Sequence, residues 1–450
     1  MTGPDAVDLL RALIRDACVN DGRPTSGGEA RAVDTIAGLL GAPDAIVEPA
    51  PARQSAVWRV PGIRPGAPSL LLMGHTDVVP VSEDGWSVDP FGAEIRDGFV
   101  WGRGAVDMLN LTAAMAVVFG AYRSGEIEPP PGDLIFLAVA DEEAAGGLGA
   151  RPLVDERWDL VGAPYVLTEI AYPPIPTSAG LVHPVSVAEK GPHWSVLRAT
   201  GTPGHGSQPY GRDNALEPLA RGLAGLFTTP SPVVISEVWR EFVAALSLPG
   251  DLAAALVDPD RVDEAIEHLT ADDPLFASYV HACTHLTVSP NVVSGGVKAN
   301  VIPDRAEAQI DLRALPGQTR VDVDHHLRKA MGSAADRIEI LPVADHPANA
   351  SGRDNPLWEA IVDGIEGMTR SRRVAPAMMP ATTDGRFFRD RGSIVYGVGL
   401  FDDMAVSFPA FLSMFHGNDE RVSVASVERT TELLDRVVAR FGELSAIPGP

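Results

Sequence analysis

Side chains that could bind metal ions or move protons lie at the ends of apolar segments or just before a predicted helix. They are His75 and Asp77 after "LLLMG", Asp107 in "WGRGAVDMLN", Glu142 and Glu143 in "ADEEAAGG", Glu169 in "YVLTEI" and His416 in "MFHGNDER". Carboxylates and neutral imidazoles are the ligands that zinc and similar divalent ions prefer. These residue types would suffice for a pair of metal ions with one bridging carboxylate, and a spare acid could then act as a base.

Each of these segments also has a purely structural interpretation. His75 and Asp77 could form a polar cap on a buried strand, and Asp107 could cap the helix that follows it. The acids at positions 141–143 could form a solvated turn that opens a helix. However, burying adjacent carboxylates costs free energy unless cations or hydrogen bonds compensate for it. The shared chemistry of the whole set therefore favours metal binding.

The elements around these residues predict an α/β fold. Strand-like apolar runs at residues 54–60, 69–74, 134–140 and 164–170 alternate with helical patterns, and the alternation resumes after residue 349. Such alternation is typical of a mixed or parallel sheet flanked by helices, with functional loops at the strand ends.

The pattern changes after about residue 185. Residues 193–201, 286–296 and 306–315 look like strands of an antiparallel layer, with amphipathic helices in "NALEPLARGLAGL" and "DVDHHLRKAMG". Residues 230–285 look like extra helices in a long insertion. We therefore predict that residues 187–346 form an inserted α+β domain between the two parts, 1–186 and 347–450, of the main domain.

Composition and charge exclude several classes of protein. The formal net charge of −24 and the pI of about 4.8 disfavour nucleic acids and anionic membranes as partners. No apolar run approaches the roughly 18 residues of a membrane span. The two cysteines, Cys18 and Cys283, cannot build a disulfide framework and fit a reducing compartment. The amino-terminal segment looks like an amphipathic helix rather than a leader, so we expect a cytoplasmic protein.

The sequence resembles the co-catalytic zinc peptidases of metallopeptidase family M20, which include aminoacylase-1, carboxypeptidase S, acetylornithine deacetylase and succinyl-diaminopimelate desuccinylase. The segments that carry this resemblance occur in the family's order and span nearly the whole chain. They are "GHTDVVP", "WGRGAVDMLN", "ADEEAAGG", "GTPGHGSQP", "NVIPDRAEAQIDLR", "ATTDGRFFRDRG" and "MFHGNDERVSV". The resemblance implies a zinc-peptidase catalytic domain with an inserted lid domain, through which some members dimerise.

The resemblance also implies a role for each candidate residue. His75 and Glu169 would hold one metal ion, Glu143 and His416 the other, and Asp107 would bridge the two. Glu142 would be the general base that activates a water between the ions, and Asp77 would orient His75. The ions would be zinc first, with cobalt or manganese as alternatives.

Residues of the inserted domain would complete the site. By the same resemblance, His205 would stabilise the oxyanion, across the subunit interface in dimeric members, and Asn300 and Arg313 would bind the substrate carboxylate. Taken alone, His205 and Asn300 could be turn residues and Arg313 a surface ion pair.

A turn at residues 382–385 is a further candidate for substrate binding. The backbone N–H groups of Thr383 and Gly385 could cradle a carboxylate, and Arg386 is a weaker candidate. His281, His285, His325 and His326 have no motif around them and look like packing or surface histidines.

The expected activity is hydrolysis of an amide bond next to a free carboxylate, in an N-acyl amino acid or a short peptide. Leu109 and Asn110 follow the Asp-Met pair where family members commonly have lysine and glycine, so details of that loop should differ. A glutamate at position 169 favours deacylases and carboxypeptidases. The alternatives are a non-catalytic amino-acid or peptide-binding protein on the same fold, and a two-metal hydrolase of another class, such as a phosphoesterase.

Overall fold

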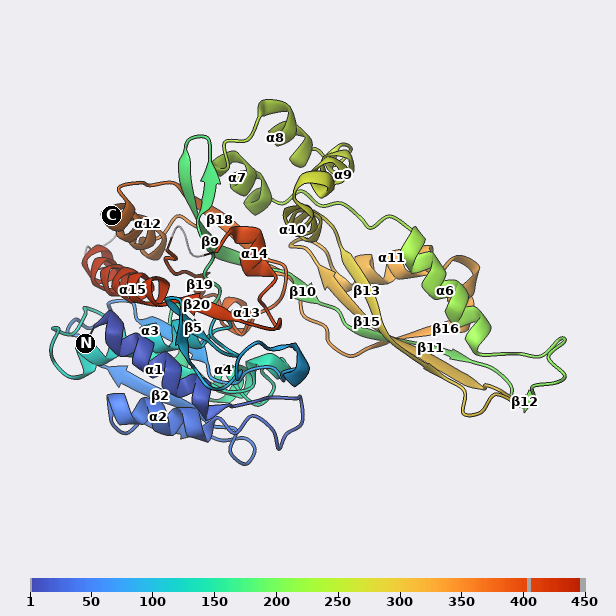
Figure 1. Cartoon of the computed structure of the whole chain (residues 1–450), viewed down its shortest axis with the longest axis horizontal. Helices are drawn as coiled ribbons and strands as arrows, with labels where there is room; N and C mark the ends of the chain where they lie inside the picture. Colours follow the sequence, from blue (N-terminus) through green and yellow to red (C-terminus); the bar gives the residue numbers. More distant parts are fainter. Residues whose placement is uncertain (1, 403–405, 446–450) are drawn as a thin grey trace.

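The computed structural model describes residues 2–402 and 406–445 and shows an elongated molecule in which a lid domain extends from a large domain (Figure 1). A ten-stranded mixed sheet, with the order β1-β2-β6-β3-β7-β19-β9-β17 and with β8 and β18 paired to β9, forms the large domain. Its strands are β1 (Ala45–Val47), β2 (Ser55–Val60), β3 (Leu70–His75), β6 (Leu134–Val139), β7 (Tyr165–Thr168), β8 (Ile175–Thr177), β9 (Gly180–Glu189), β17 (Asn349–Ala350), β18 (Val374–Met379) and β19 (Ile394–Gly397). The central strands β6, β3, β7 and β19 run parallel, as the sequence predicts.

Helices cover both faces of this sheet, which explains why its central strands are apolar throughout. One face packs against α1 (Gly3–Asp16), α2 (Ala30–Leu40), α3 (Leu109–Arg123), α12 (Pro356–Thr369) and α15 (Val424–Ser445), and the other against α4 (Ala150–Glu156), α5 (Trp158–Val161) and α13 (Gly385–Asp390). Along β3, Leu70 and Leu72 join the first of these cores, whereas Leu71 and Met73 join the second. A parallel strand buried on both faces needs this continuous apolar run.

The amino-terminal helix α1 forms as the sequence predicts. Pro4 lies in its first turn and Thr2 and Asp5 form a capping box at its start. Beside the main sheet, β4 (Ile95–Arg96), β5 (Phe99–Trp101) and β20 (Arg421–Ser423) form a small sheet. In residues 2–402 and 406–445, no helix combines the length and apolarity that crossing a membrane requires.

The lid has its own sheet and its own core. Its elements are β10 (Gly191–Pro192), β11 (Ser195–Thr200), β13 (Thr287–Gly295), β15 (Arg305–Ala314) and β16 (Ile338–Pro342), with helices α6 (Leu216–Thr228) and α11 (Arg320–Met331) and the 3-10 turn η3 (Gly332–Arg337) on one face. All strand pairs in this sheet are antiparallel. Side chains alternate along β15, so that Ile310 and Leu312 are buried under the helices, whereas Asp311 and Arg313 lie on the opposite face.

The insertion does not belong to the lid core. Its helices are α7 (Glu237–Ala245), α8 (Gly250–Leu256), α9 (Val262–Asp272) and α10 (Pro274–Thr284), which confirms the expected extra helices. Trp239, Phe242 and Tyr279 pack into the core of the large domain, above β18 and α14 (Phe408–Leu412) (Figure 1). In addition, β9 continues to Glu189, beyond the predicted boundary at residue 186. We therefore propose to count the insertion with the large domain and to begin the lid after Lys190.

Candidate metal centre

Neighbouring parallel strands bring most of the predicted ligands to one edge of the large sheet. His75 is the last residue of β3, Glu142 and Glu143 lie in the 3-10 turn η2 (Glu142–Ala144) after β6, and Glu169 follows β7. Because β6, β3 and β7 are adjacent and parallel, their carboxyl ends meet at this edge. Asp107, in the turn before α3, and His416, after α14, complete the set.

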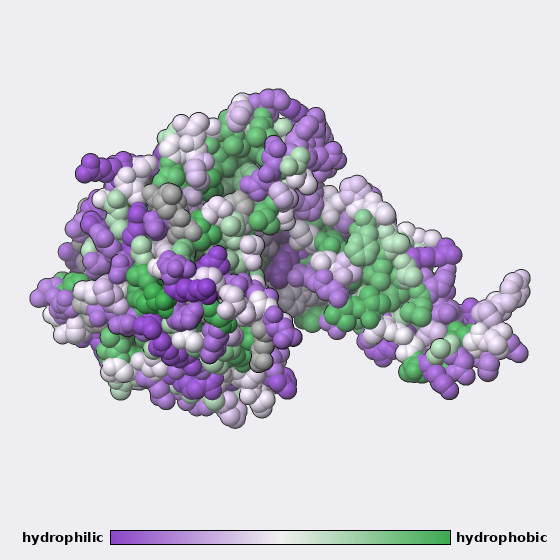
Figure 2. Space-filling view, in the orientation of Figure 1, coloured by the Kyte–Doolittle hydropathy of each residue, from purple (hydrophilic) through white to green (hydrophobic). Residues whose placement is uncertain are grey.

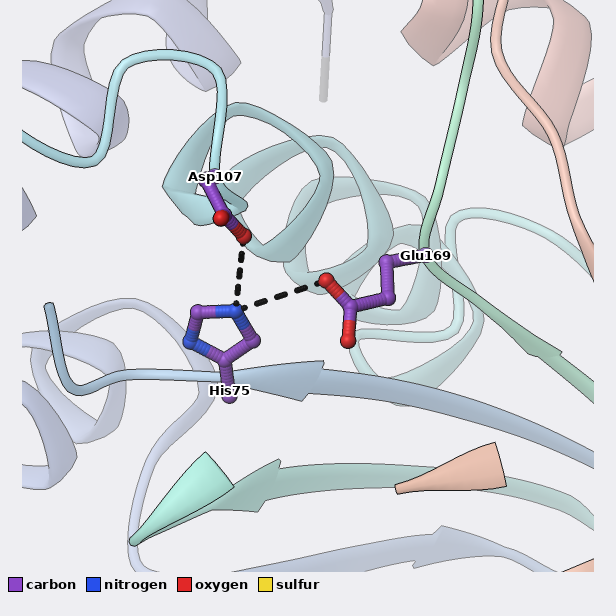
Figure 3. A group of neighbouring side chains, drawn as sticks. All are labelled: His75, Asp107 and Glu169. Carbon is purple, nitrogen blue, oxygen red and sulfur yellow. Dashed lines mark hydrogen bonds and ion pairs between the residues drawn. The ribbon is translucent and has the colours of Figure 1, made fainter. Parts of the chain in front are cut away.

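The structure groups these side chains around two positions. The imidazole Nε2 of His75 lies 3.2 Å from Asp107 Oδ1 and 3.6 Å from Glu169 Oε2 (Figure 3). On the other side, His416 Nε2 lies 3.4 Å from Asp107 Oδ2 and 3.2 Å from Glu143 Oε2. The two oxygens of Asp107 therefore face different groups, which is the arrangement that a bridging carboxylate needs.

This arrangement fits two divalent cations. In the part of the chain that the structure describes, only His75–Asp107–Glu169 and Asp107–Glu143–His416 combine at least three such ligand atoms within 4.8 Å of one another. The Oε1 atom of Glu143 is buried and has no hydrogen-bond partner. A buried carboxylate oxygen without a donor is costly unless a cation compensates for it.

The pKa values of the acids and of His416 also favour the binding of cations. Burial, together with the charge of Glu169, raises the pKa of Glu142 well above its usual range, and burial with Asp107 raises the pKa of Glu143 to about 7. Contacts with Asp107 and Glu143 raise the pKa of His416 to about 10. Without cations the site therefore retains protons, which bound divalent ions would displace.

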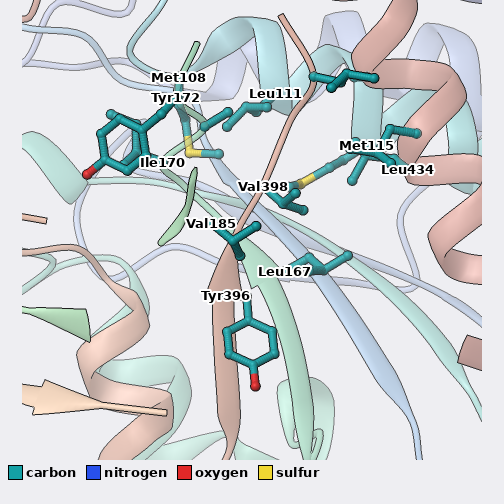
Figure 4. Close-up of a cluster of buried hydrophobic side chains, with 14 of the residues drawn as sticks. Met108, Leu111, Met115, Leu167, Ile170, Tyr172, Val185, Tyr396, Val398 and Leu434 are labelled. Atoms are coloured by element: carbon teal, nitrogen blue, oxygen red, sulfur yellow. The ribbon is translucent and has the colours of Figure 1, made fainter. Parts of the chain in front are cut away.

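Packing of the residues that follow Asp107 and Glu169 holds these two ligands in place. Met108 and Ile170, which directly follow Asp107 and Glu169, are buried in the cluster that Figure 4 shows, together with residues of α3, β7 and α15. The backbone N–H of His75 also lies 3.4 Å from Met108 Sδ. Two of the ligands are thus attached to a close-packed core that limits their movement.

Asp77 contacts His75 through its main chain and not through its carboxylate. The Nδ1 atom of His75 lies 2.9 Å from the backbone carbonyl oxygen of Asp77, whereas the Asp77 carboxylate is 3.7 Å away. That carboxylate instead accepts hydrogen bonds from the backbone N–H groups of Glu142 and Glu143, at 3.2 and 3.1 Å, and from the side chain of Asn20. Asp77 therefore orients His75 through its main chain and holds the turn of the two glutamates through its side chain.

Glu420 is a functional residue that the sequence reasoning missed. Its fully buried carboxylate accepts hydrogen bonds from Arg103 and from the backbone N–H groups of Gly104, Val106 and Asp107, at distances between 2.7 and 3.1 Å. It thus anchors the turn that presents the bridging ligand. In the sequence it stands among charged neighbours in "NDER", a pattern typical of an exposed loop.

A cavity of about 330 Å³ opens beside the ligands, between the large domain and the lid. The molecular surface is hollowed in this region (Figure 2). Arg313, Trp194 and Pro192 of the lid line it, together with Glu142, Met379, Thr382, Arg386 and Phe415 of the large domain.

Arg313 combines the two interpretations that its sequence allows. Its Nε donates to Asp311 at 3.0 Å, as in an ordinary ion pair, and its guanidinium lies 5.6 Å from the centre of the Trp194 ring. Its Nη1 lies 3.4 Å from Thr382 Oγ1, at the cavity. Asp311 and Trp194 thus hold the guanidinium from one side, while its other edge faces the space beside the ligands.

The prediction for the turn at residues 382–385 is wrong in its detail. The backbone N–H of Thr383 donates to Glu189 Oε2 at 2.6 Å, and that of Gly385 donates to Thr383 Oγ1 at 3.1 Å. Both groups are therefore satisfied within the protein and cannot cradle a substrate. Thr382 and Arg386 line the cavity in their place.

His205 and Asn300 lie far from this cavity. His205 is the last residue of β12 (Gly204–His205), and Asn300 directly precedes β14 (Val301–Ile302). These two short strands pair with each other at the far end of the lid (Figure 1). The backbone N–H of Gly206 donates to the carbonyl oxygen of Asn300 at 2.8 Å. Both side chains are exposed there.

Comparison with known proteins supports the resemblance. The model of peptidase family M20/M25/M40 matches residues 71–440. The chain belongs to this family. Human N-fatty-acyl-amino acid synthase/hydrolase PM20D1 is 25% identical over 399 residues, which cover 85% of this chain and 76% of that protein. The succinyl-diaminopimelate desuccinylase of Methylobacterium nodulans is 27% identical over 458 residues, which cover 97% and 96%.

Solved structures of M20 members share the fold. The M20 family metallo-carboxypeptidase Sso-CP2 from Sulfolobus solfataricus has a TM-score of 0.71 at 16% identity, covering 98% of this chain and 99% of that one. The YXEP protein of Bacillus subtilis, described as a dinuclear metal binding peptidase, has a TM-score of 0.58 at 14% identity, covering 97% of both chains. This M20 protein is therefore a member of a family of hydrolases, with the mixed sheet and inserted domain that its sequence predicts.

Proposed function

We propose that the protein is a two-metal hydrolase that cleaves an amide bond next to a free carboxylate, in an N-acyl amino acid or a short peptide. The observation that carries this proposal is the cavity that brings together the paired ligand groups, which share Asp107, the half-buried Glu142 and the cationic Arg313. The names of the relatives support the same substrate class, because they describe an N-fatty-acyl-amino acid hydrolase, a desuccinylase and a carboxypeptidase.

The ligand groups would hold the metal ions as the resemblance implies. His75, Asp107 and Glu169 would bind one ion, and Asp107, Glu143 and His416 the other, with zinc, cobalt or manganese as the metal. Two such ions, when bound, polarise a carbonyl group and lower the pKa of a water.

The remaining steps belong to side chains of the protein. Glu142 belongs to neither ligand group, so its carboxyl group is free for proton transfer. It would accept the proton of the attacking water and return it to the nitrogen of the leaving amine. Arg313 would bind the substrate carboxylate through the edge of its guanidinium that Asp311 leaves open. The carboxylate of Asp77 would keep Glu142 in place by accepting a hydrogen bond from the backbone N–H of Glu142.

A homodimer would bring His205 and Asn300 to a cavity. Neither lies near the cavity of its own chain, so we propose that each lid contributes them to the site of a partner, where His205 would donate a hydrogen bond to the developing oxyanion. The lid exposes apolar side chains that such a contact would cover, which are Leu216, Phe227, Val292, Val293 and Val297. Hydrophobic residues also gather on the lid in Figure 2.

We further propose a cytoplasmic location, because Cys18 and Cys283 are both buried and free.

The test combines metal analysis with hydrolysis. Protein purified without chelators should contain close to two divalent ions per chain and release amine from N-acetyl amino acids, N-succinyl amino acids or dipeptides. Glu142→Gln should lower kcat by about 100-fold or more, within the range of general-base catalysis, while metal content stays the same. Glu156→Gln, an exposed acid at the end of α4, is the matched control and should not change kcat. Turnover of Glu142→Gln at the wild-type rate would exclude the assigned role.

A further inference from the structure

The helical insertion contacts the strand that leads into the cavity. The hydroxyl of Tyr279 on α10 donates to the carbonyl oxygen of Met378 at 3.0 Å, and Cys283 Sγ lies 3.9 Å from the same oxygen. Met379, the next residue and the last of β18, lines the cavity. The insertion therefore holds the end of β18 at the point where the strand reaches the substrate space.

A second path from Tyr279 reaches the same side chain through aromatic rings. The Tyr279 ring packs edge-on against Phe408, with 5.1 Å between the centroids, and Phe408 lies 5.4 Å from Tyr172. The hydroxyl of Tyr172 lies 3.5 Å from Met379 Sδ and donates to it. All three rings are buried, so this stack fixes the Met379 side chain as well as its backbone.

Phe415, a second apolar residue of the cavity lining, packs against the same aromatic cluster. Phe415 lines the cavity and packs edge-on against Phe411 at 5.1 Å, and Phe411 in turn contacts Tyr172 at 6.4 Å. We call Met379 and Phe415 the apolar wall. Pro192 and Trp194 of the lid line the same cavity and add apolar surface to that of the wall.

The chemistry of the wall identifies what it would bind. A cavity of about 330 Å³ is at the small end of ligand pockets, which span roughly 300 to 1,000 Å³. With Arg313 available for a carboxylate and Glu142 beside the ligand groups, the apolar wall is left for a group that flanks the scissile amide. Each methylene of that group removed from water would favour binding about fourfold.

We propose that the insertion α7–α10 positions the apolar wall and thereby selects amide substrates with an apolar group beside the scissile bond, either an amino-acid side chain or a short acyl chain. This inference rests on the proposed function. Tyr279 does not line the cavity and acts as a positioning residue, because it holds both the backbone before Met379 and the ring that supports its side chain.

Substrate series measure this selection directly. One arm varies the amino acid, with N-acetyl derivatives of alanine, leucine and phenylalanine. The other arm varies the acyl group, with acetyl, butyryl and hexanoyl alanine. The wild-type, metal-loaded protein should show a kcat/KM that rises at least tenfold across one of the arms, and the arm in which it rises identifies the group that meets the wall.

Variants test which residues form and position the apolar wall. Met379→Ala should reduce that rise by about tenfold, within the range for lost contacts in an apolar pocket, and Tyr279→Phe should reduce it severalfold, in both cases because kcat/KM falls more for the larger substrates of the arm than for N-acetyl-alanine. Tyr165→Phe is the matched control, because its ring packs on Phe441 away from the cavity, and its selectivity should equal that of wild type. A role of Tyr279 in stability alone would shift the melting temperature without changing the ratio between substrates.

The outcomes separate the two proposals. If the metal-loaded protein hydrolyses neither these amides nor the N-succinyl amino acids and dipeptides of the first test, the proposed function fails and this inference fails with it. If it hydrolyses only the N-succinyl amino acids or dipeptides, the inference is overturned and the proposed function stands. If it hydrolyses the amides of the substrate series with equal kcat/KM along both arms, or if Met379→Ala and Tyr279→Phe keep the wild-type selectivity, the inference is overturned and the proposed function stands.

Discussion

Replacing Glu420 with glutamine should both destabilise the fold and weaken metal binding. The buried carboxylate accepts hydrogen bonds from Arg103 and from three backbone N–H groups around Asp107. A glutamine cannot neutralise Arg103, and its amide nitrogen would face N–H groups that need an acceptor. Leaving a buried charge without its partner costs about 3–5 kcal/mol. Because the same bonds hold the turn of Asp107, metal affinity should also fall about 10- to 100-fold.

The assay compares equal substitutions at buried and exposed sites. Urea unfolding of metal-free Glu420→Gln should show a free energy of unfolding about 3–5 kcal/mol below wild type. Glu432→Gln removes a glutamate that pairs with Arg436 at the surface, where such pairs contribute about 0–1 kcal/mol. Competition with a metal-sensitive dye should show the drop in affinity for Glu420→Gln alone. A loss below 1 kcal/mol, or equal losses in both variants, would refute the role given to Glu420.

Three further predictions concern the bridge, the carboxylate site and pH. Asp107→Ala should reduce bound metal from close to two ions per chain to less than one, because its oxygens face both ligand groups; elemental analysis after dialysis measures this, and two retained ions would contradict a bridge. Arg313→Ala should lower kcat/KM at least about tenfold for a substrate with a free carboxylate but leave its amidated counterpart unchanged; equal effects on both would exclude carboxylate recognition. Burial lowers the pKa of His281 to about 4. Between pH values of about 6.5 and 4, His281 is therefore protonated in the unfolded chain but neutral in the folded chain, so the free energy of unfolding falls as the pH drops through this range. Between pH 7 and pH 5, His281→Gln should lose about 2 kcal/mol less stability than wild type in urea unfolding, and identical losses would show that His281 does not titrate in this way.

The main-domain elements were predictable because their local patterns are strong. The continuous apolar runs before His75, Glu142 and Glu169 predict buried parallel strands, and the structure confirms them as β3, β6 and β7. Adjacent parallel strands present their carboxyl ends at one edge. The grouping of the candidate ligands follows from that geometry together with the order of motifs along the chain.

Other features depend on contacts between distant residues. Asp77 was expected to orient His75, and the contact runs through its backbone carbonyl oxygen, because its carboxylate accepts hydrogen bonds from the backbone N–H groups of residues 142–143. Thr383 was expected to bind substrate, but Glu189 takes its N–H. In both cases the competing partner comes from another part of the chain, so no local pattern contains it.

The sequence by itself determined which chemistry the protein can carry, because residue types and strand periodicity are local properties. It identified the acids and imidazoles, the order in which they follow apolar strands, and the family that shares this order. Only the tertiary structure decided that the oxygens of Asp107 face separate ligand groups, that Glu420 anchors their turn, and that the insertion packs on the large domain behind Met379. These relations join residues far apart in the chain, and they exist only where close packing of the core brings the residues together.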